Sequence, residues 1–286
     1  MLYMAGVTWR FLNTRFENAF FNMAADEAVL ESVREGVSPP VFRAFGWRPP
    51  GLSFGYAQRV GREVNLGRCR EMGVEVVRRP TGGRAVLHWN ELTYSVLCRG
   101  DDPLVGGGVL EAYRRISECL VAGLRLFGVA ADLVRSEPPS VRPAGEPITS
   151  PCFSSAARHE VAIGGRKLIG SAQRRMGDML LQHGSLILGP EHRRIVDLLR
   201  LTSEDLRAQF RLELDEGTTS LEEALGRPVA FDDLAECLRR GFEERLGLPF
   251  VEQPLTGLER ERIEILVREK YGTDAWNFAA QRRVIW

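Results

Sequence analysis

Lysine is almost missing from this 286-residue chain: of its 38 lysine and arginine residues, only Lys167 and Lys270 are lysine. Acidic residues also number 38, so the chain lacks the excess positive charge with which nucleic-acid-binding proteins attract phosphates. Its basic residues are not interleaved with aromatic ones, as they are in proteins that bind single strands. We therefore expect no nucleic-acid partner.

Long apolar runs are missing as well. No stretch approaches the roughly 18 apolar residues that span a bilayer. The first residues, MLYMAGVTWRF, show no basic flank followed by an apolar core, which a signal peptide would have. We therefore expect neither membrane insertion nor export, and we predict a cytoplasmic protein.

Cysteine and histidine are too few and too widely spaced for a disulfide framework or a zinc site. The five cysteines contain no CxxC pair, and none of the four histidines lies at metal-ligand spacing from another histidine or a cysteine. The odd number of thiols fits a reducing compartment. The sequence therefore predicts no bound metal.

The distribution of apolar residues predicts an α+β fold. Short apolar and β-branched runs predict strands at 41–47, 52–56, 74–79, 85–88, 92–98, 159–163, 166–175 and 180–188. Helical spacing predicts helices at 22–35, 109–127, 191–200, 203–210, 220–225, 231–246 and 256–270. Asn22 is a possible cap of the first helix. The glycine pair 164–165 indicates a hairpin, and hairpins imply a mixed, mainly antiparallel sheet.

The segment RRPTGGRA, residues 78–85, is the first candidate for ligand binding. Its two glycines let the backbone approach a ligand closely, and their N–H groups could bind an anion. Three arginines in the segment could hold a phosphate or a carboxylate. The segment is not a P-loop, because no Gly-Lys-Ser/Thr follows. The alternative is a plain β-turn with solvated arginines.

Cys152 is the second candidate. It follows residues 135–151, which contain five prolines and few large apolar side chains, so we expect a mobile loop there. Cys98, Cys119 and Cys237 fall in these predicted elements and Cys69 in a further expected helix, where cysteine usually behaves as a small buried residue. A reactive thiol needs the access that Cys152 should have. The alternative is an ordinary buried thiol.

Lys167 is the third candidate, because lysine is so rare in this chain. A desolvated lysine can release a proton at physiological pH, whereas arginine cannot. Strand alternation places Lys167 on one face with Ile169 and Ser171. A cation at about 4 Å would lower the pKa of a thiol, ordinarily near 8.5, by one or more units. We hypothesise a Cys152–Lys167 pair; the alternative is a surface lysine on an edge strand.

Several motifs that occur in a fixed order carry a family resemblance. They are RRPTGGRAVLHWNELTYS, PCF, GRKLIGSAQRR, LQHGSLIL and, near the C-terminus, EKYGTDAWNF. Over roughly residues 8–280 the chain resembles the lipoate–protein ligase A / octanoyltransferase family, and most closely its LipM-type octanoyltransferase subgroup. The resemblance implies a biotin/lipoate protein ligase-like fold with helices flanking the sheet. We expect a catalytic domain at 1–250 and a C-terminal helical extension at 251–286.

The resemblance also implies an activity. The subgroup transfers an octanoyl group from acyl carrier protein to a lysine of a lipoyl domain, typically the glycine-cleavage H protein, and it needs no ATP or other cofactor. Cys152 falls on the subgroup's acyl-thioester nucleophile, and Lys167 falls on the lysine that lowers the pKa of this cysteine. The loop that lines the acyl or adenylate site corresponds to Arg79, Gly82, Gly83 and His88.

Two alternatives remain open. A true lipoate–protein ligase would share the fold, the lysine and the glycine turn, but would activate lipoate with ATP and Mg²⁺. Such ligases usually show Asn-Asp before the hairpin strand, where this chain has Arg158-His159-Glu160, and they need no cysteine at position 152. The other alternative is a non-catalytic accessory subunit that binds lipoyl domains or acyl chains.

An eight-carbon acyl tail would need an apolar tunnel, since burying about seven methylenes is worth roughly 5–6 kcal/mol. We expect Phe45, Phe54, Tyr56 and Val86 to form its walls. The proline-rich segment 135–151 is expected to close over the acyl group or to become ordered when the lipoyl domain docks.

Overall fold

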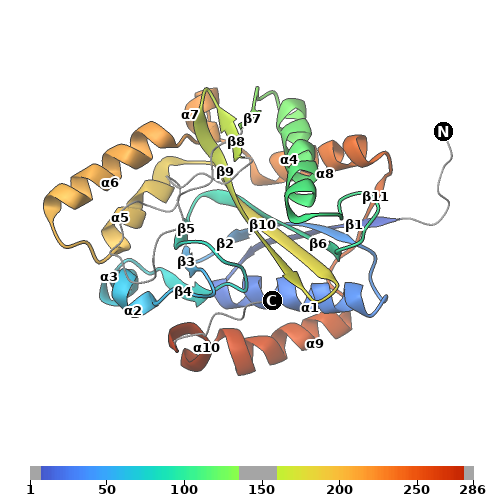
Figure 1. The fold of residues 1–286 in the computed structure, drawn as a ribbon, viewed down its shortest axis with the longest axis horizontal. Helices are drawn as coiled ribbons and strands as arrows, with labels where there is room; N and C mark the ends of the chain where they lie inside the picture. Colours follow the sequence, from blue (N-terminus) through green and yellow to red (C-terminus); the bar gives the residue numbers. More distant parts are fainter. Residues whose placement is uncertain (1–7, 135–159, 280–286) are drawn as a thin grey trace.

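The computed structural model describes residues 8–134 and 160–279 (Figure 1). Cys152 and the proline-rich segment 135–151 lie outside the described residues, as do Arg158 and His159. The predicted behaviour of that segment therefore stays a prediction.

Two sheets form the framework. The larger contains β1 (Trp9–Glu17), β2 (Val41–Trp47), β6 (Glu91–Arg99), β7 (Asp132–Val134), β8 (Glu160–Ile163), β9 (Arg166–Met176), β10 (Met179–Ile187) and β11 (Phe250–Glu252). Its spatial order is β11-β1-β2-β6-β10-β9-β8-β7. The smaller contains β3 (Gly51–Phe54), β4 (Glu75–Arg78) and β5 (Val86–His88), in the order β4-β3-β5.

The pairing of the strands confirms the predicted mixed, mainly antiparallel arrangement. Among the described strands, β1 is parallel to β2 and β11, and β3 is parallel to β4, whereas the other pairs are antiparallel. The hairpin predicted at the glycine pair 164–165 joins β8 to β9. The sequence patterns did not predict β1, β7 or β11.

Helices cover both faces of the large sheet (Figure 1). One face carries α4 (Val109–Leu126) and α8 (Phe231–Leu246), and the other carries α1 (Ala19–Arg34) with α9 (Gly257–Leu266) packed on it. Among the described residues, the remaining helical elements are α2 (Val60–Glu63), α3 (Leu66–Glu71), α5 (Ile195–Leu198), α6 (Glu204–Gly217), α7 (Leu221–Leu225), α10 (Asp274–Phe278), the 3-10 helix Pro190–Arg194 and the π-helix Val267–Tyr271.

Side-chain alternation along the central strands separates the cores. In β10, Leu180 and Leu186 pack with α4 and α8, whereas Met179 and Leu181 face the core beside α1. A third core lies between the small sheet and helices α3, α5 and α6. The edge at which the two sheets meet is therefore enclosed by packed elements on several sides, and it is here that the candidate residues gather.

The first helix begins earlier than predicted, and its cap is a different asparagine. Asn18 is extended and its side chain accepts a hydrogen bond from the Phe21 N–H at 2.9 Å, which makes it the N-cap. The prediction of Asn22 as the cap is wrong. Asn22 lies inside the helix, and its buried amide donates to the Gly46 carbonyl at 2.9 Å, tying α1 to β2.

Contacts also cross the domain boundary predicted at residue 250. β11 pairs with β1, and α9 packs on α1. Arg10 of β1 and Glu259 of α9 form a buried ion pair with 2.8 Å between Nη1 and Oε1. The division into residues 1–250 and 251–286 stays a prediction. Within the described residues, no helix is long and apolar enough to cross a membrane.

Candidate active site

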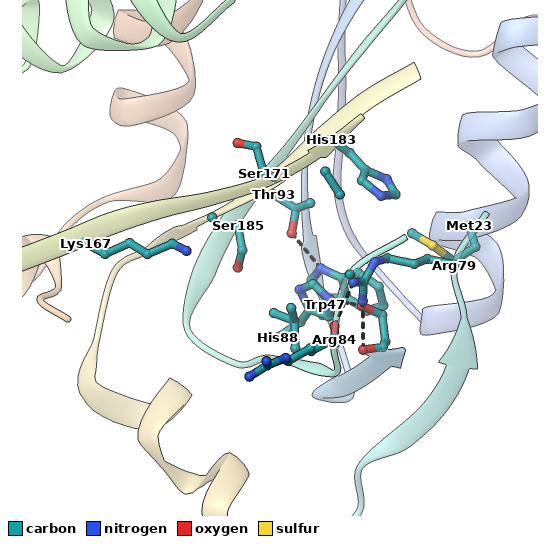
Figure 2. Close-up of a pocket in the computed structure, with 16 residues that line it drawn as sticks. Met23, Trp47, Arg79, Arg84, His88, Thr93, Lys167, Ser171, His183 and Ser185 are labelled. Carbon is teal, nitrogen blue, oxygen red and sulfur yellow. Dashed lines mark hydrogen bonds between the residues drawn. The ribbon is translucent and has the colours of Figure 1, made fainter. Parts of the chain in front are cut away.

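A cavity of about 210 Å³ lies where the two sheets meet (Figure 2). Its walls come from strands of both sheets, from Met23 of α1 and from residues 79–84, which we call the glycine turn. Lys167, Arg79, Gly83 and His88 all line it. The structure thus brings together four of the six residues expected at the site.

The other two expected residues are placed differently. Gly82 lies in the glycine turn, where its carbonyl accepts hydrogen bonds from Arg79 Nε at 3.1 Å and Nη2 at 2.7 Å, but it is not one of the residues that line the cavity. Cys152 lies outside the described residues, so the Cys152–Lys167 pair stays a prediction.

Lys167 enters the cavity from β9, on the side opposite to Arg79 and Met23 (Figure 2). β9 lies between β8 and β10, so the alternative of a surface lysine on an edge strand is wrong. The side chain is 9% exposed, and its Nζ lies 2.5 Å from Glu160 Oε1. The strand pattern predicted one face for Lys167 and Ile169, but Ile169 packs in the core beside α4, next to a bulge.

The glycine turn is not a hairpin turn. β4 and β5 pair with opposite edges of β3, so the turn crosses the end of that strand. Gly83 has φ +95°, and a Cβ there would lie 2.6 Å from Arg79 Nη2. A Cβ on Gly55 would lie 2.1 Å from the Gly83 carbonyl oxygen. Glycine is therefore required at both positions, because any side chain would displace the turn.

The arginines of the turn do not behave as solvated side chains. Arg79 is buried and donates to the carbonyls of Gly82 and Arg84, both at 2.7 Å, and to the Ser53 carbonyl at 3.1 Å. The alternative of a plain β-turn with solvated arginines is therefore wrong. The hydrogen bonds of Arg79 hold the backbone of the glycine turn in place.

Arg78, the neighbouring arginine, has a different structural role. It is fully buried, and it donates to the backbone carbonyls of Tyr56, Gln58, Trp276, Asn277 and Ala279 at 2.6–3.1 Å. Burial lowers its pKa from the usual value. The expectation that Arg78 could hold a phosphate or carboxylate is wrong, because its guanidinium group joins α10 to the strand before the glycine turn.

His88 stands in a buried polar network. Its Nδ1 lies 2.7 Å from Glu91 Oε1, and its Nε2 lies 2.7 Å from Ser53 Oγ. The ring stacks on the indole of Trp47, with 4.0 Å between the centroids. Trp47 Nε1 donates to Thr93 Oγ1 at 2.7 Å, and that hydroxyl donates to Glu91 at 2.5 Å. The His88 ring is therefore held by Glu91, Ser53 and Trp47.

His183, on β10, has a similar arrangement. Its Nδ1 lies 3.2 Å from Asp26 Oδ2, and its Nε2 lies 2.7 Å from Thr81 Oγ1. Asp26 is buried against Arg43 at 2.6 Å. Burial opposes ionisation of Asp26, but the charge of Arg43 and hydrogen bonds from His183 and Ser95 outweigh it and hold the pKa of Asp26 below its usual value. Burial also lowers the pKa of His183, so the ring is neutral at pH 7.

The apolar walls differ from those expected. Val86 lines the cavity, but Phe45 packs beside α1 and Phe54 packs in the core of the small sheet. Tyr56 lines a separate cavity next to α10. The prediction of these three aromatic residues as tunnel walls is wrong. Trp47, Met23 and Ala172 line the cavity instead.

Sequence reasoning also missed the carboxylates behind the two histidines. Glu91 begins the buried strand β6, and Asp26 lies on the buried face of α1. Buried carboxylates in such positions usually have a polar partner, which is the signal that could have revealed them. Within residues 8–134 and 160–279, no group of three or more His, Cys, Asp or Glu residues is placed to hold a metal ion.

Residues 18–243 match the family model of the lipoyl protein ligase A/B catalytic domain. The chain belongs to this family. Two relatives of known name are both called octanoyltransferase LipM. That of Kyrpidia tusciae is 43% identical, and the match covers 95% of this chain and 98% of the relative. That of Moorella thermoacetica is 40% identical, with 96% and 98% covered.

Solved structures of the family show the same fold. The bipartite lipoate protein ligase of Thermoplasma acidophilum matches with a TM-score of 0.79 at 24% identity, covering 98% of this chain and all of that one. A lipoate–protein ligase A bound with ATP matches with a TM-score of 0.74 at 25% identity, covering 96% and 100%. The biotin/lipoate ligase-like fold predicted from the motifs is therefore confirmed.

Proposed function

We propose that this protein is an octanoyltransferase of protein lipoylation. It is an acyltransferase, as are the near-full-length relatives that share 36–43% of its residues. The observation that carries the proposal is the position of Lys167. In a chain with two lysines, this one projects into a cavity bordered by the glycine turn and by apolar side chains. A cavity with apolar walls and with Lys167, Arg79 and Arg84 among its polar lining residues suits an acyl chain with a reactive carbonyl end.

The proposed reaction has two half-reactions. The Cys152 thiolate attacks the thioester carbonyl of octanoyl-acyl carrier protein, and the carrier's thiolate leaves. The amine of a lysine on a lipoyl domain, such as the glycine-cleavage H protein, then attacks the enzyme thioester. The amide bond forms, the amine loses a proton and the Cys152 thiolate is released. The exchange of one thioester for another is close to balanced in free energy, and the conversion of a thioester into an amide is favourable. The transfer therefore needs no ATP.

Lys167 would act on the first half-reaction through its charge. A free thiol is only a few per cent thiolate at pH 7. An ammonium group nearby stabilises the thiolate and lowers the pKa of the thiol. Glu160, whose Oε1 lies 2.5 Å from Lys167 Nζ, orients the lysine side chain. Lys167 is therefore proposed as the activating cation and Cys152 as the nucleophile.

The acyl chain would lie in the cavity, with Trp47, Met23, Val86 and Ala172 against its methylenes. Arg79, Gly82, Gly83 and His88 are proposed as the substrate-binding side of the site. Gly83 and His88 border the cavity directly, whereas Arg79 also shapes the turn through its bonds to backbone carbonyls.

Intact-mass spectrometry after mixing with octanoyl-acyl carrier protein, without ATP, tests the proposal. We expect wild type to gain the mass of one octanoyl group and to pass it to a lipoyl domain. Cys152→Ser should gain no thioester, and Cys237→Ser, which removes a half-buried thiol on α8, is the matched control that should still load. Full transfer by Cys152→Ser would refute the scheme.

The same assay separates the alternatives. A true lipoate–protein ligase would attach free lipoate only with ATP and Mg²⁺. A non-catalytic accessory subunit would bind the lipoyl domain without any covalent gain. The names of the relatives and the absence of Asn-Asp before β8 favour the transferase.

A further inference from the structure

Both histidines of the cavity connect a buried carboxylate to a buried hydroxyl that contacts the glycine turn. On one side the chain of contacts runs from Asp26 through His183 to Thr81, which belongs to the turn. On the other it runs from Glu91 through His88 to Ser53, which holds Arg79. The two connections come from different elements, α1 and β10 in one case, β6 and β5 in the other.

The carboxylate on one side of each histidine and the hydroxyl on the other determine which group donates each hydrogen bond. Both oxygens of Asp26 accept from other side chains, Arg43 and Ser95, and both oxygens of Glu91 accept from the hydroxyls of Thr93 and Ser185. Each carboxylate therefore acts as an acceptor, and each histidine donates to it from Nδ1. A neutral ring then has an acceptor at Nε2, and the hydroxyl of Thr81 donates to His183. Arg79 Nη1 donates to Ser53 Oγ at 3.1 Å, which leaves the Ser53 proton for Nε2 of His88. In both rings Nε2 is occupied by protein.

Water cannot readily replace these bonds. Asp26 and Thr81 are fully buried, Ser53 is 1% exposed and Glu91 is 4% exposed. A hydroxyl that loses its acceptor in such a place keeps an unsatisfied proton, which costs more than the same loss at the surface. The hydroxyl groups of Thr81 and Ser53 therefore favour the one arrangement of the glycine turn in which both keep their hydrogen bonds.

We propose that Asp26 and Glu91 are positioning residues, which fix His183 and His88 in the Nδ1–H tautomer and thereby hold the glycine turn in its acyl-binding shape. Asp26 acts through His183 on Thr81, one residue before the glycine pair. Glu91 acts through His88 and Ser53 on Arg79, at the start of the turn. The effect on acyl binding rests on the proposed function, whereas the tautomers and the anchoring do not.

Nitrogen chemical shifts of the imidazole rings test the tautomers directly. In a long-range ¹H–¹⁵N spectrum of histidine-labelled protein at pH 7.5, about one unit above the unperturbed histidine pKa, we expect both His88 and His183 to show a protonated Nδ1 and an unprotonated Nε2. The glutamine variants at each position assign the signals. A protonated Nε2 at either ring would overturn the proposal, whatever reaction the protein catalyses.

Side chains that keep one of the two bonds test the anchoring. Asparagine at position 183 can donate to Asp26 in place of Nδ1, whereas glutamine can accept from Thr81 in place of Nε2. We expect His183→Gln to load octanoyl with a kcat/KM about three- to tenfold higher than that of His183→Asn, the gain of one hydrogen bond. The difference should lie in KM, because the turn binds the acyl chain in ground and transition states alike.

We likewise expect His88→Gln to load octanoyl with a higher kcat/KM than His88→Asn. His192 supplies the control, because it is buried against Thr218 and Gly189, away from the glycine turn. Its Gln and Asn variants should show no such order in KM. Asparagine variants equal to or better than glutamine variants at 88 and 183 would overturn the proposal. If wild type loads no octanoyl group, the proposed function fails and the nitrogen spectrum alone decides the tautomers.

Discussion

Replacing Gly83 with alanine should disrupt the glycine turn, and the structure sets the magnitude. Gly83 has φ +95°, where a side chain costs about 1–2 kcal/mol. The new Cβ would lie 2.6 Å from Arg79 Nη2, which donates at 2.7 Å to two carbonyls of the turn. Moving that nitrogen gives up at least one charged hydrogen bond, worth about 1.5–3 kcal/mol. We therefore expect Gly83→Ala to lose about 2.5–5 kcal/mol of unfolding free energy.

The neighbouring glycine is a matched control for stability. A Cβ on Gly82 would meet no atom within 4 Å, and its backbone is not left-handed. Gly82→Ala should therefore change the unfolding free energy by less than about 0.5 kcal/mol. Urea unfolding of both variants gives the comparison, and octanoyl loading by Gly83→Ala should fall with its stability.

A double-mutant cycle identifies the source of the loss. If the clash with the guanidinium group contributes, Arg79→Met and Gly83→Ala together should cost less than the sum of the two single changes, by about 0.5–3 kcal/mol. Equal unfolding free energies for Gly82→Ala and Gly83→Ala would refute the reasoning. Strict additivity in the cycle would assign the whole loss to the backbone.

Three further outcomes are expected. Lys167→Met should slow octanoyl loading at pH 7 at least about tenfold, because the thiol pKa rises by one or more units, and loading should recover toward pH 9; an unchanged rate at pH 7 would contradict this. Thr81→Val should load more slowly than Thr81→Ser, which keeps the hydroxyl bonded to His183, and equal rates would count against the anchoring. Burial opposes ionisation of Glu259, but hydrogen bonds from Arg10 and the Thr256 backbone hold its pKa below the usual value. Glu259→Gln should therefore cost about 3–5 kcal/mol at neutral pH. The wild-type advantage should be full above the unfolded pKa near 4.3 and fade as pH falls through the folded value, and a difference that stays constant to pH 2 in acid unfolding would exclude the ion pair as its source.

Local patterns were enough to predict the elements that surround the site. Alternation and glycine pairs located β8, β9 and β10, and helical spacing located α4 and α8 within a few residues. The rarity of lysine singled out Lys167, which does enter the cavity. These predictions succeeded because each depends on residues that are close in sequence.

The features that the sequence did not reveal depend on contacts between distant residues. β3 separates β4 from β5, so the glycine segment that reads as a tight turn crosses a strand. Asp26 reaches His183 across 157 positions. Trp47 rather than Phe45 lines the cavity, although both lie on the same face of β2 and pack in the core beside α1, so alternation could not tell which of the two reaches the cavity.

The carbonyls that hold Arg78 have a consequence for how the enzyme is made. Three of them belong to Trp276, Asn277 and Ala279, so the strand that leads into the glycine turn gains these partners only after some 200 further residues have been synthesised. A nascent chain cannot complete these contacts while those residues are still inside the ribosomal exit tunnel. A product of premature termination before residue 276 would lack all three of these contacts and should therefore be inactive instead of partly active.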